Sequence, residues 1–208
     1  MVKTGEWLSE GWDLVKQDLF AHVLLALVVG LGSAITGGIL GGPLICGYIW
    51  IIIEKMRNPA YKPAIGDLGK GFEVFVHALV ACLIWSLFAS VASSACGLGQ
   101  FVVNGFLVFT YPLIMDRRME FWPAIQASYE KVTPDWLGFC LFHLAQVGVM
   151  LLGVIACVVG VFVTGPICVV AMVAAYRDNF GLEGAAAAPP TEPMAPPTAP
   201  MPPPTPTQ

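Results

Sequence analysis

Residues 74–115 read VFVHALVACLIWSLFASVASSACGLGQFVVNGFLVFTYPLIM, and these 42 residues include no Asp, Glu, Lys or Arg. A helix that crosses a bilayer needs about 20 apolar residues, so this stretch has room for two. Its middle carries Cys96-Gly97-Leu98-Gly99, where the glycines favour a turn. The stretch therefore predicts two membrane helices joined by a short turn.

Two further stretches share this pattern. Leu19–Ile53 and Trp136–Tyr176 also lack charged residues, and all 24 charged residues of the chain lie outside the three stretches. Leu19–Ile53 has 35 residues, which is slightly short for two full crossings, so its helices must extend into their flanks or enter only part of the way. The chain is 57% hydrophobic and 12% charged, with a mean hydropathy of +0.75. This composition excludes an ordinary water-soluble domain and predicts an all-α polytopic membrane helical bundle.

Turn residues near the middle of each stretch divide the three stretches into six transmembrane helices, arranged as three repeated hairpins. An even number of spans places both termini and both charged loops on one side of the membrane, and that side holds every Lys and Arg. The positive-inside rule identifies this side as the cytoplasm. We therefore expect a multi-pass protein with cytoplasmic N- and C-termini. The six helices are expected near residues 18–36, 39–56, 72–95, 98–118, 135–157 and 160–179.

Seven glycines and prolines are expected to form structural turns and kinks. Proline lacks a backbone N–H, so it suits the first turn of a helix, as at Pro43 and Pro166, and should kink a helix further along, as at Pro112. Small residues also let neighbouring helices approach closely. The full set is Gly37, Gly42, Pro43, Gly99, Pro112, Gly160 and Pro166.

Four tryptophans lie at the edges of the charged segments. An indole at such a place can keep its ring among lipid headgroups and its N–H in water, so we interpret them as interface anchors, with core packing as the alternative. They are Trp7, Trp12, Trp122 and Trp136.

An internal repeat of about 61 residues relates the apolar stretches. Ala95-Cys96-x-x-Gly99-x-Phe101-Val102 matches Ala156-Cys157-x-x-Gly160-x-Phe162-Val163, although chance matching of abundant small residues is an alternative. Cys96 and Cys157 then occupy equivalent outer turns. A short aromatic and acidic element precedes each hairpin and is expected to lie at the membrane surface. These elements are Gly11-Trp12-Asp13, Gly71-Phe72-Glu73 and Ser128-Tyr129-Glu130.

Several short motifs resemble an uncharacterised family of bacterial inner-membrane proteins, which is similar to the membrane domain joined to some glycerophosphodiester phosphodiesterases. The motifs are Gly42-Pro43-Leu44, Gly66-Asp67-Leu68, Gly71-Phe72-Glu73, Pro112-Leu113-Ile114, Asp116-Arg117, Phe121-Trp122 with Ala124, Ala175-Tyr176-Arg177-Asp178 and Phe180-Gly181. The resemblance covers about residues 5–181. It implies a six-span protein of the bacterial inner (cytoplasmic) membrane and brings no catalytic residues with it, because this chain has no phosphodiesterase portion.

The C-terminal segment differs from the rest of the chain. Residues 184–208 include ten prolines, with Ala, Thr and a single charge at Glu192. Such a composition cannot form a packed core. We therefore expect a transmembrane helical domain at 1–183 and a disordered Pro-rich cytoplasmic tail at 184–208.

Three histidines are the candidate polar site of the apolar stretches. His22, His77 and His143 each lie within eight residues of a preceding acid, and so at similar predicted depth. One hypothesis is a shared site for a metal ion or a proton, because imidazole binds metals and titrates near neutral pH. The alternative is that each histidine bonds separately to a carbonyl or a headgroup.

The remaining patterns favour no chemistry. Zinc-binding spacings, hydrolase signatures and phosphate-binding loops are absent from the sequence, so we predict no catalytic residue, no metal and no cofactor. The scattered basic residues do not predict nucleic-acid binding. The expected function is that of a non-enzymatic membrane scaffold or assembly partner, embedded in the lipid bilayer, with protein partners bound through its cytoplasmic loops and tail. The alternative is a passive channel or transporter for a small or lipidic substrate.

Overall fold

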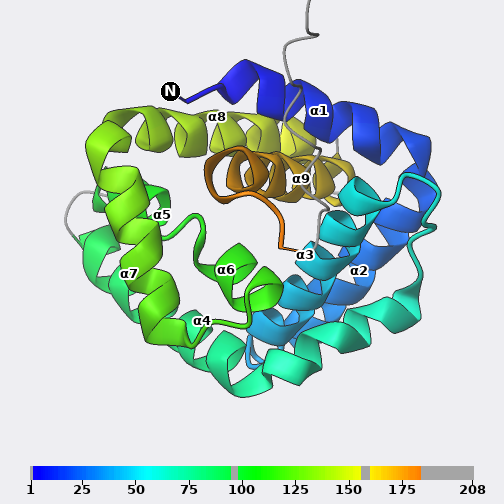
Figure 1. The fold of residues 1–208 in the computed structure, drawn as a ribbon, viewed down its shortest axis with the longest axis horizontal. Helices are drawn as coiled ribbons and strands as arrows, with labels where there is room; N and C mark the ends of the chain where they lie inside the picture. The colour runs from blue at the N-terminus through cyan, green and yellow to red at the C-terminus, as the bar shows by residue number, and fades with distance from the viewer. Residues whose placement is uncertain (1, 95–97, 156–159, 184–208) are drawn as a thin grey trace, which may run out of the picture.

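A computed structural model describes residues 2–94, 98–155 and 160–183, and the regular elements among these residues are all helices. Figure 1 shows them arranged around a common centre. The elements are α1 (Thr4–Gln17), α2 (Leu19–Ile35), α3 (Gly41–Arg57), the 3-10 helix η1 (Ile65–Val74), α4 (Phe75–Ser94), α5 (Leu98–Phe106), α6 (Thr110–Asp116), α7 (Phe121–Val132), the 3-10 turn η2 (Thr133–Asp135), α8 (Trp136–Ile155) and α9 (Val161–Phe180).

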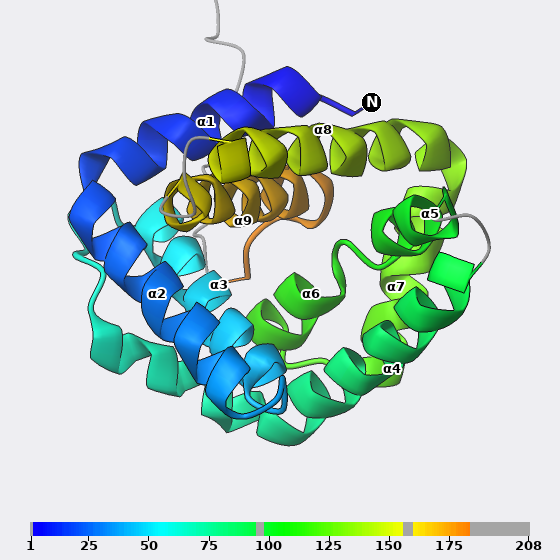
Figure 2. The same cartoon turned by 180° about the vertical axis from the view of Figure 1, so that it is seen from behind.

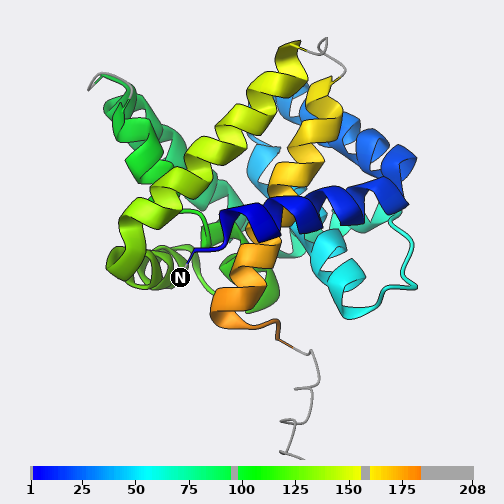
Figure 3. The same ribbon diagram turned by 90° about the horizontal axis from the view of Figure 1, so that it is seen from above.

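The order of the elements repeats along the chain. A short helix is followed by a long apolar helix and then by a second, returning segment. We call these the first set (α1, α2, α3), the second set (η1, α4, α5, α6) and the third set (α7, η2, α8, α9). In Figure 3 the far ends of α4 and α8 lie toward one side of the molecule, and the C-terminal end of α9 lies toward the opposite side.

The returning segments form the centre of the molecule, as Figures 1 and 2 show. Helices α3, α6 and α9 bury side chains such as Ile53, Ile114 and Val170. The long helices α2, α4 and α8 surround them and expose large apolar side chains, to an extent that water-soluble proteins rarely reach. These exposed residues include Phe20, Leu27, Leu31, Val76, Leu83, Leu87, Leu141, Leu144 and Leu151.

Three helical segments of the described chain are long and apolar enough to cross a membrane. They are Ile65–Phe88, Phe121–Ile155 and Val161–Phe180. A fourth is added if α1 and α2, which meet at a bend of 102°, count together as one broken span. The described part of the chain is thus all-helical, with three or four candidate membrane-spanning helices.

The fourth predicted helix, 98–118, is two helices, α5 and α6. Pro112 lacks an N–H and so removes the helical hydrogen bond to the carbonyl four residues earlier. The Ser128 hydroxyl of α7 enters the break, where it donates to the Phe106 carbonyl (2.6 Å) and accepts from the Phe109 N–H (3.2 Å). The break therefore lies upstream of the kink expected at Pro112. It forms there because Ser128, from another set, bonds to the backbone groups of Phe106 and Phe109 that the break leaves without helical partners.

The other predicted turn and kink residues divide into two kinds. Gly37 lies in the α2–α3 turn with φ +60°, a left-handed conformation that glycine adopts readily. Pro43 is the third residue of α3, in its first turn as predicted, whereas Pro166 is the sixth residue of α9 and lies past its first turn. Its position within the helix corrects the prediction, because α9 already begins at Val161.

The remaining predicted glycines lie at or inside helix starts. Gly42 is in α3 and Gly99 is in α5, and Gly160 is the N-cap of α9. A Cβ on Gly42 would collide with the Ala78 carbonyl of α4, and one on Gly160 would collide with the Gly153 carbonyl of α8. Glycine is needed there for close helix packing.

Each short helix packs against the returning segment of another set. A Cβ on Gly11 of α1 would lie 2.7 Å from the carbonyl oxygen of Ile167 in α9. A Cβ on Gly71 of η1 would collide with the Pro43 carbonyl of α3. Ser128 of α7 instead enters the α5–α6 break. The three sets therefore contact one another in a closed ring.

Candidate functional site

The C-terminal ends of α3, α6 and α9 meet at a buried carboxylate. Asp116, the last residue of α6, has a side chain with no exposed surface. Its Oδ1 lies 2.5 Å from Nη2 of Arg57, at the end of α3. Its Oδ2 accepts hydrogen bonds from the Tyr176 hydroxyl of α9 (2.8 Å) and from the Glu183 backbone N–H (3.0 Å). We call these four residues the axial cluster.

The axial cluster has the chemistry of a structural tie. Burying a carboxylate is costly unless a cation and hydrogen-bond donors compensate for the lost water. Arg57 supplies the charge, and two neutral donors occupy the other oxygen. Arg57 also donates to the Glu183 carbonyl, which fastens the segment after α9 to the end of α3. A carboxylate so fully bonded links all three sets.

Further ion pairs join separate elements within the charged segments. Arg177 forms a two-nitrogen pair with Glu10, with distances of 2.5 and 3.1 Å, and so holds α1 against α9. Such pairs fix the short helices to their neighbours. The other two are Asp18–Lys55 (2.8 Å) and Glu73–Arg118 (2.6 Å).

The three candidate histidines have different surroundings. His22 is fully buried, and its Nδ1 lies 2.9 Å from the Tyr48 hydroxyl. His143 Nε2 lies 3.0 Å from Nδ2 of Asn104, and Nδ1 of His77 has no hydrogen-bond partner in the part of the chain that the structure describes. Among those same residues, no three His, Cys, Asp or Glu side chains form a group that could hold a metal ion. A site for a shared proton stays a prediction.

Asn104 and Gln146 build polar contacts that sequence reasoning did not assign. Asn104 accepts from the Trp85 indole (2.6 Å) and donates to His143, which joins α5 to α4 and α8. Gln146 of α8 donates to the Cys168 carbonyl of α9 (2.9 Å). Amides are conspicuous in such apolar stretches, but their partners depend on how the helices cross.

The structure corrects the role expected for Trp7. This residue is only 2% exposed, its Nε1 donates to Oδ2 of Asp178 (3.0 Å), and its ring packs edge-on against Phe142. Trp7 is a core residue because α1 lies against α8 and α9. Trp12, Trp122 and Trp136 are each about half exposed, as an indole at a headgroup boundary would be.

Comparison with models of protein families, with curated proteins and with solved structures finds no match for this chain. The resemblance to a bacterial membrane family therefore stays a prediction. Cys96, Cys157 and the tail at 184–208 lie outside the described residues, and the expectations about them also stay predictions.

Proposed function

We propose that this chain is a non-enzymatic scaffold of the bacterial inner membrane, with six spans in three hairpins and both termini in the cytoplasm. The thrice-repeated element order and the apolar exteriors of α2, α4 and α8 support this arrangement. Helices α2 and α3 have 17 residues each, or about 25 Å, against about 30 Å of hydrocarbon. The first hairpin therefore crosses with help from its flanks or from a locally thinner bilayer.

The observation that best supports a scaffold function is the centre of the molecule, which is filled with packed side chains. A passive channel through the ring would need a polar path between α3, α6 and α9. Those helices instead bury Ile53, Leu113 and Val170, and at their ends Arg57 and Asp116 neutralise each other. Such a rigid centre is suited to holding the charged loops and the tail in fixed positions, where partner proteins can bind them.

Cysteine labelling tests the topology. The sequence pattern predicts that Cys96 and Cys157 lie in outer turns, so a membrane-impermeant thiol reagent should label them in intact cells, before or after reduction. Cys96→Ser and Cys157→Ser variants assign the signal to each position. If the two cysteines are labelled only after the cells are opened, the membrane orientation is the reverse of the one proposed.

Reconstitution and capture test the function. Liposomes containing the protein should leak ions and small solutes no faster than empty liposomes, because the centre is filled. A flux that depends on the protein would support the channel alternative and overturn the scaffold.

In the capture experiment, a cytoplasmic partner cross-linked to wild type should be lost when exposed Lys62 of the α3–η1 loop becomes Glu. It should be retained by Leu141→Ala, a change on the apolar exterior of α8. Equal recovery of the partner with both variants would count against binding through this loop.

A further inference from the structure

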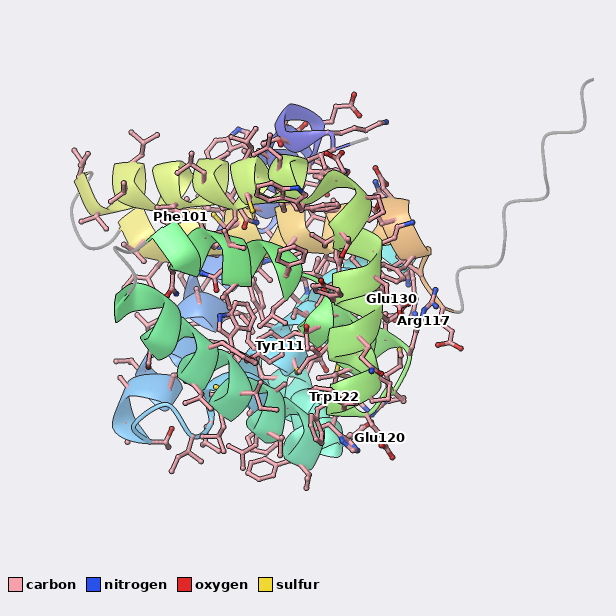
Figure 4. All side chains as sticks on the ribbon, turned by 90° about the vertical axis from the view of Figure 1, so that its left-hand side faces the viewer. Phe101, Tyr111, Arg117, Glu120, Trp122 and Glu130 are labelled. Atoms are coloured by element: carbon pink, nitrogen blue, oxygen red, sulfur yellow. The ribbon has the colours of Figure 1, made fainter. Side chains whose placement is uncertain are left out.

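An apolar groove opens on the flank of the molecule between α4, α5 and α7. Its volume is about 530 Å³, within the range of small-molecule sites. Phe88 of α4, Val103 and Phe106 of α5, and Ile125 of α7 line it. In Figure 4 the three helices frame this face, with Trp122 on α7 at one end.

The groove lies beside the interface between the second and third sets, which is built differently from the other two interfaces between sets. Gly11 and Gly71 bring their helices into backbone contact with α9 and α3. At the corresponding place α7 carries Ser128, and the segment it meets is broken into α5 and α6. A side chain instead of a hydrogen atom keeps α7 further from its neighbour.

The opening is continuous with the apolar exterior. Phe88 and Val102 line the groove and are also exposed, so the groove opens sideways toward the same surroundings as the outer faces of α2, α4 and α8. Helix α7 crosses its end on the side where the chain carries its charges, with Trp122 and Glu130 on that helix (Figure 4). The groove is thus open to lipid along its length and closed by polar groups at one end.

We propose that this groove binds one acyl chain of a phospholipid with an amine headgroup. The proposal rests on the membrane location proposed above. The almost wholly apolar lining offers a polar solute few partners. A spanning helix of a partner protein, about 10 Å wide, would collide with α7, whereas a flexible acyl chain ends at the headgroup level.

The groove's polar end selects the headgroup. Glu130 is the one charged residue that lines the groove, and it forms no ion pair within the described part of the chain. Its carboxylate attracts an ammonium group and repels an anionic headgroup. Gln126, one helical turn before Glu130 on α7, can donate to the phosphate, and the Trp122 indole lies a further turn along the same helix.

Lipid titration of the purified, delipidated chain tests the site. Native mass spectrometry with phosphatidylethanolamine should show one lipid bound tightly to wild type. Val103→Trp fills the groove and should weaken binding about tenfold, the effect of losing contact with about two methylenes. Leu141→Trp places the same indole on the outer face of α8 and should bind like wild type.

Two further measurements keep the proposal falsifiable. If Val103→Trp does not fold, Ile125→Trp serves as the blocking variant. The fluorescence of Trp122 is the part of the wild-type signal that Trp122→Phe lacks. A lipid with brominated chains should quench this part when one lipid is bound per protein. Glu130→Gln should retain binding but lose most of the preference for phosphatidylethanolamine over phosphatidylglycerol.

Wild-type affinity in a folded blocking variant, or unquenched Trp122, would overturn the lipid site. Unchanged headgroup preference in Glu130→Gln would overturn the role of Glu130. Absence of the chain from membranes would instead refute the proposed function, so the two failures are distinguishable.

Discussion

The η1–α3 interface and the α7–α5–α6 interface perform the same task in different ways. Gly71 lets η1 press directly on the backbone of α3, which is one continuous helix. Ser128 holds α7 to its neighbour through hydrogen bonds across a break, beside a groove of about 530 Å³. Glycine against a continuous helix therefore accompanies a closed interface, suited to stability, whereas serine against a broken helix accompanies an open one that leaves room for a ligand.

The largest effect is expected at the closed interface. Gly71→Ala forces a methyl group against the Pro43 carbonyl, and backbone cannot yield as a side chain can, so we expect a loss of about 3 kcal/mol. Thermal unfolding in a mild detergent measures it, as a fall of about 2–4 °C per kcal/mol. Gly66→Ala on the same element meets no atom within 4 Å and is the matched control. Equal melting of the two variants would show that the η1–α3 interface is not tightly closed.

An intermediate effect is expected from a pair of tryptophans. Trp7→Phe keeps an aromatic ring beside Phe142 but loses the hydrogen bond to Asp178, for about 2 kcal/mol. Trp122→Phe at the open interface should change stability by less than about 0.5 kcal/mol, because this side chain is half exposed. Chemical unfolding of both variants measures the difference. A reversed order would mean that α7 is held more firmly than α1.

A loss smaller than those of Gly71→Ala and Trp7→Phe is expected at Ser128. Ser128→Ala removes the bonds to the Phe106 carbonyl and the Phe109 N–H, at a cost of about 1.5 kcal/mol. The loss should stay below that of Gly71→Ala, because no atoms collide. Detergent melting and hydrogen exchange at Phe109 measure it, and exchange there should become faster. Unaltered exchange would show that Ser128 does not hold the break.

Local pattern determined where most of the helices lie, with the broken helix at 98–118 as the exception. The predicted helices 72–95 and 135–157 correspond to α4 at Phe75–Ser94 and α8 at Trp136–Ile155. Hydropathy and turn residues act over a few neighbouring positions, so the sequence alone reveals them. The same local reasoning indicated three short elements, and Gly11, Gly71 and Ser128 in these elements do lie at the contacts between sets.

Only the tertiary structure decided what these helices contact. Trp7 is core rather than an interface anchor because Asp178 and Phe142, distant in the chain, pack on it. Asp116 became the centre of the axial cluster because α3 and α9 end beside it. Such pairings depend on helix crossings between residues far apart in sequence, and hydropathy carries no record of which helices will cross.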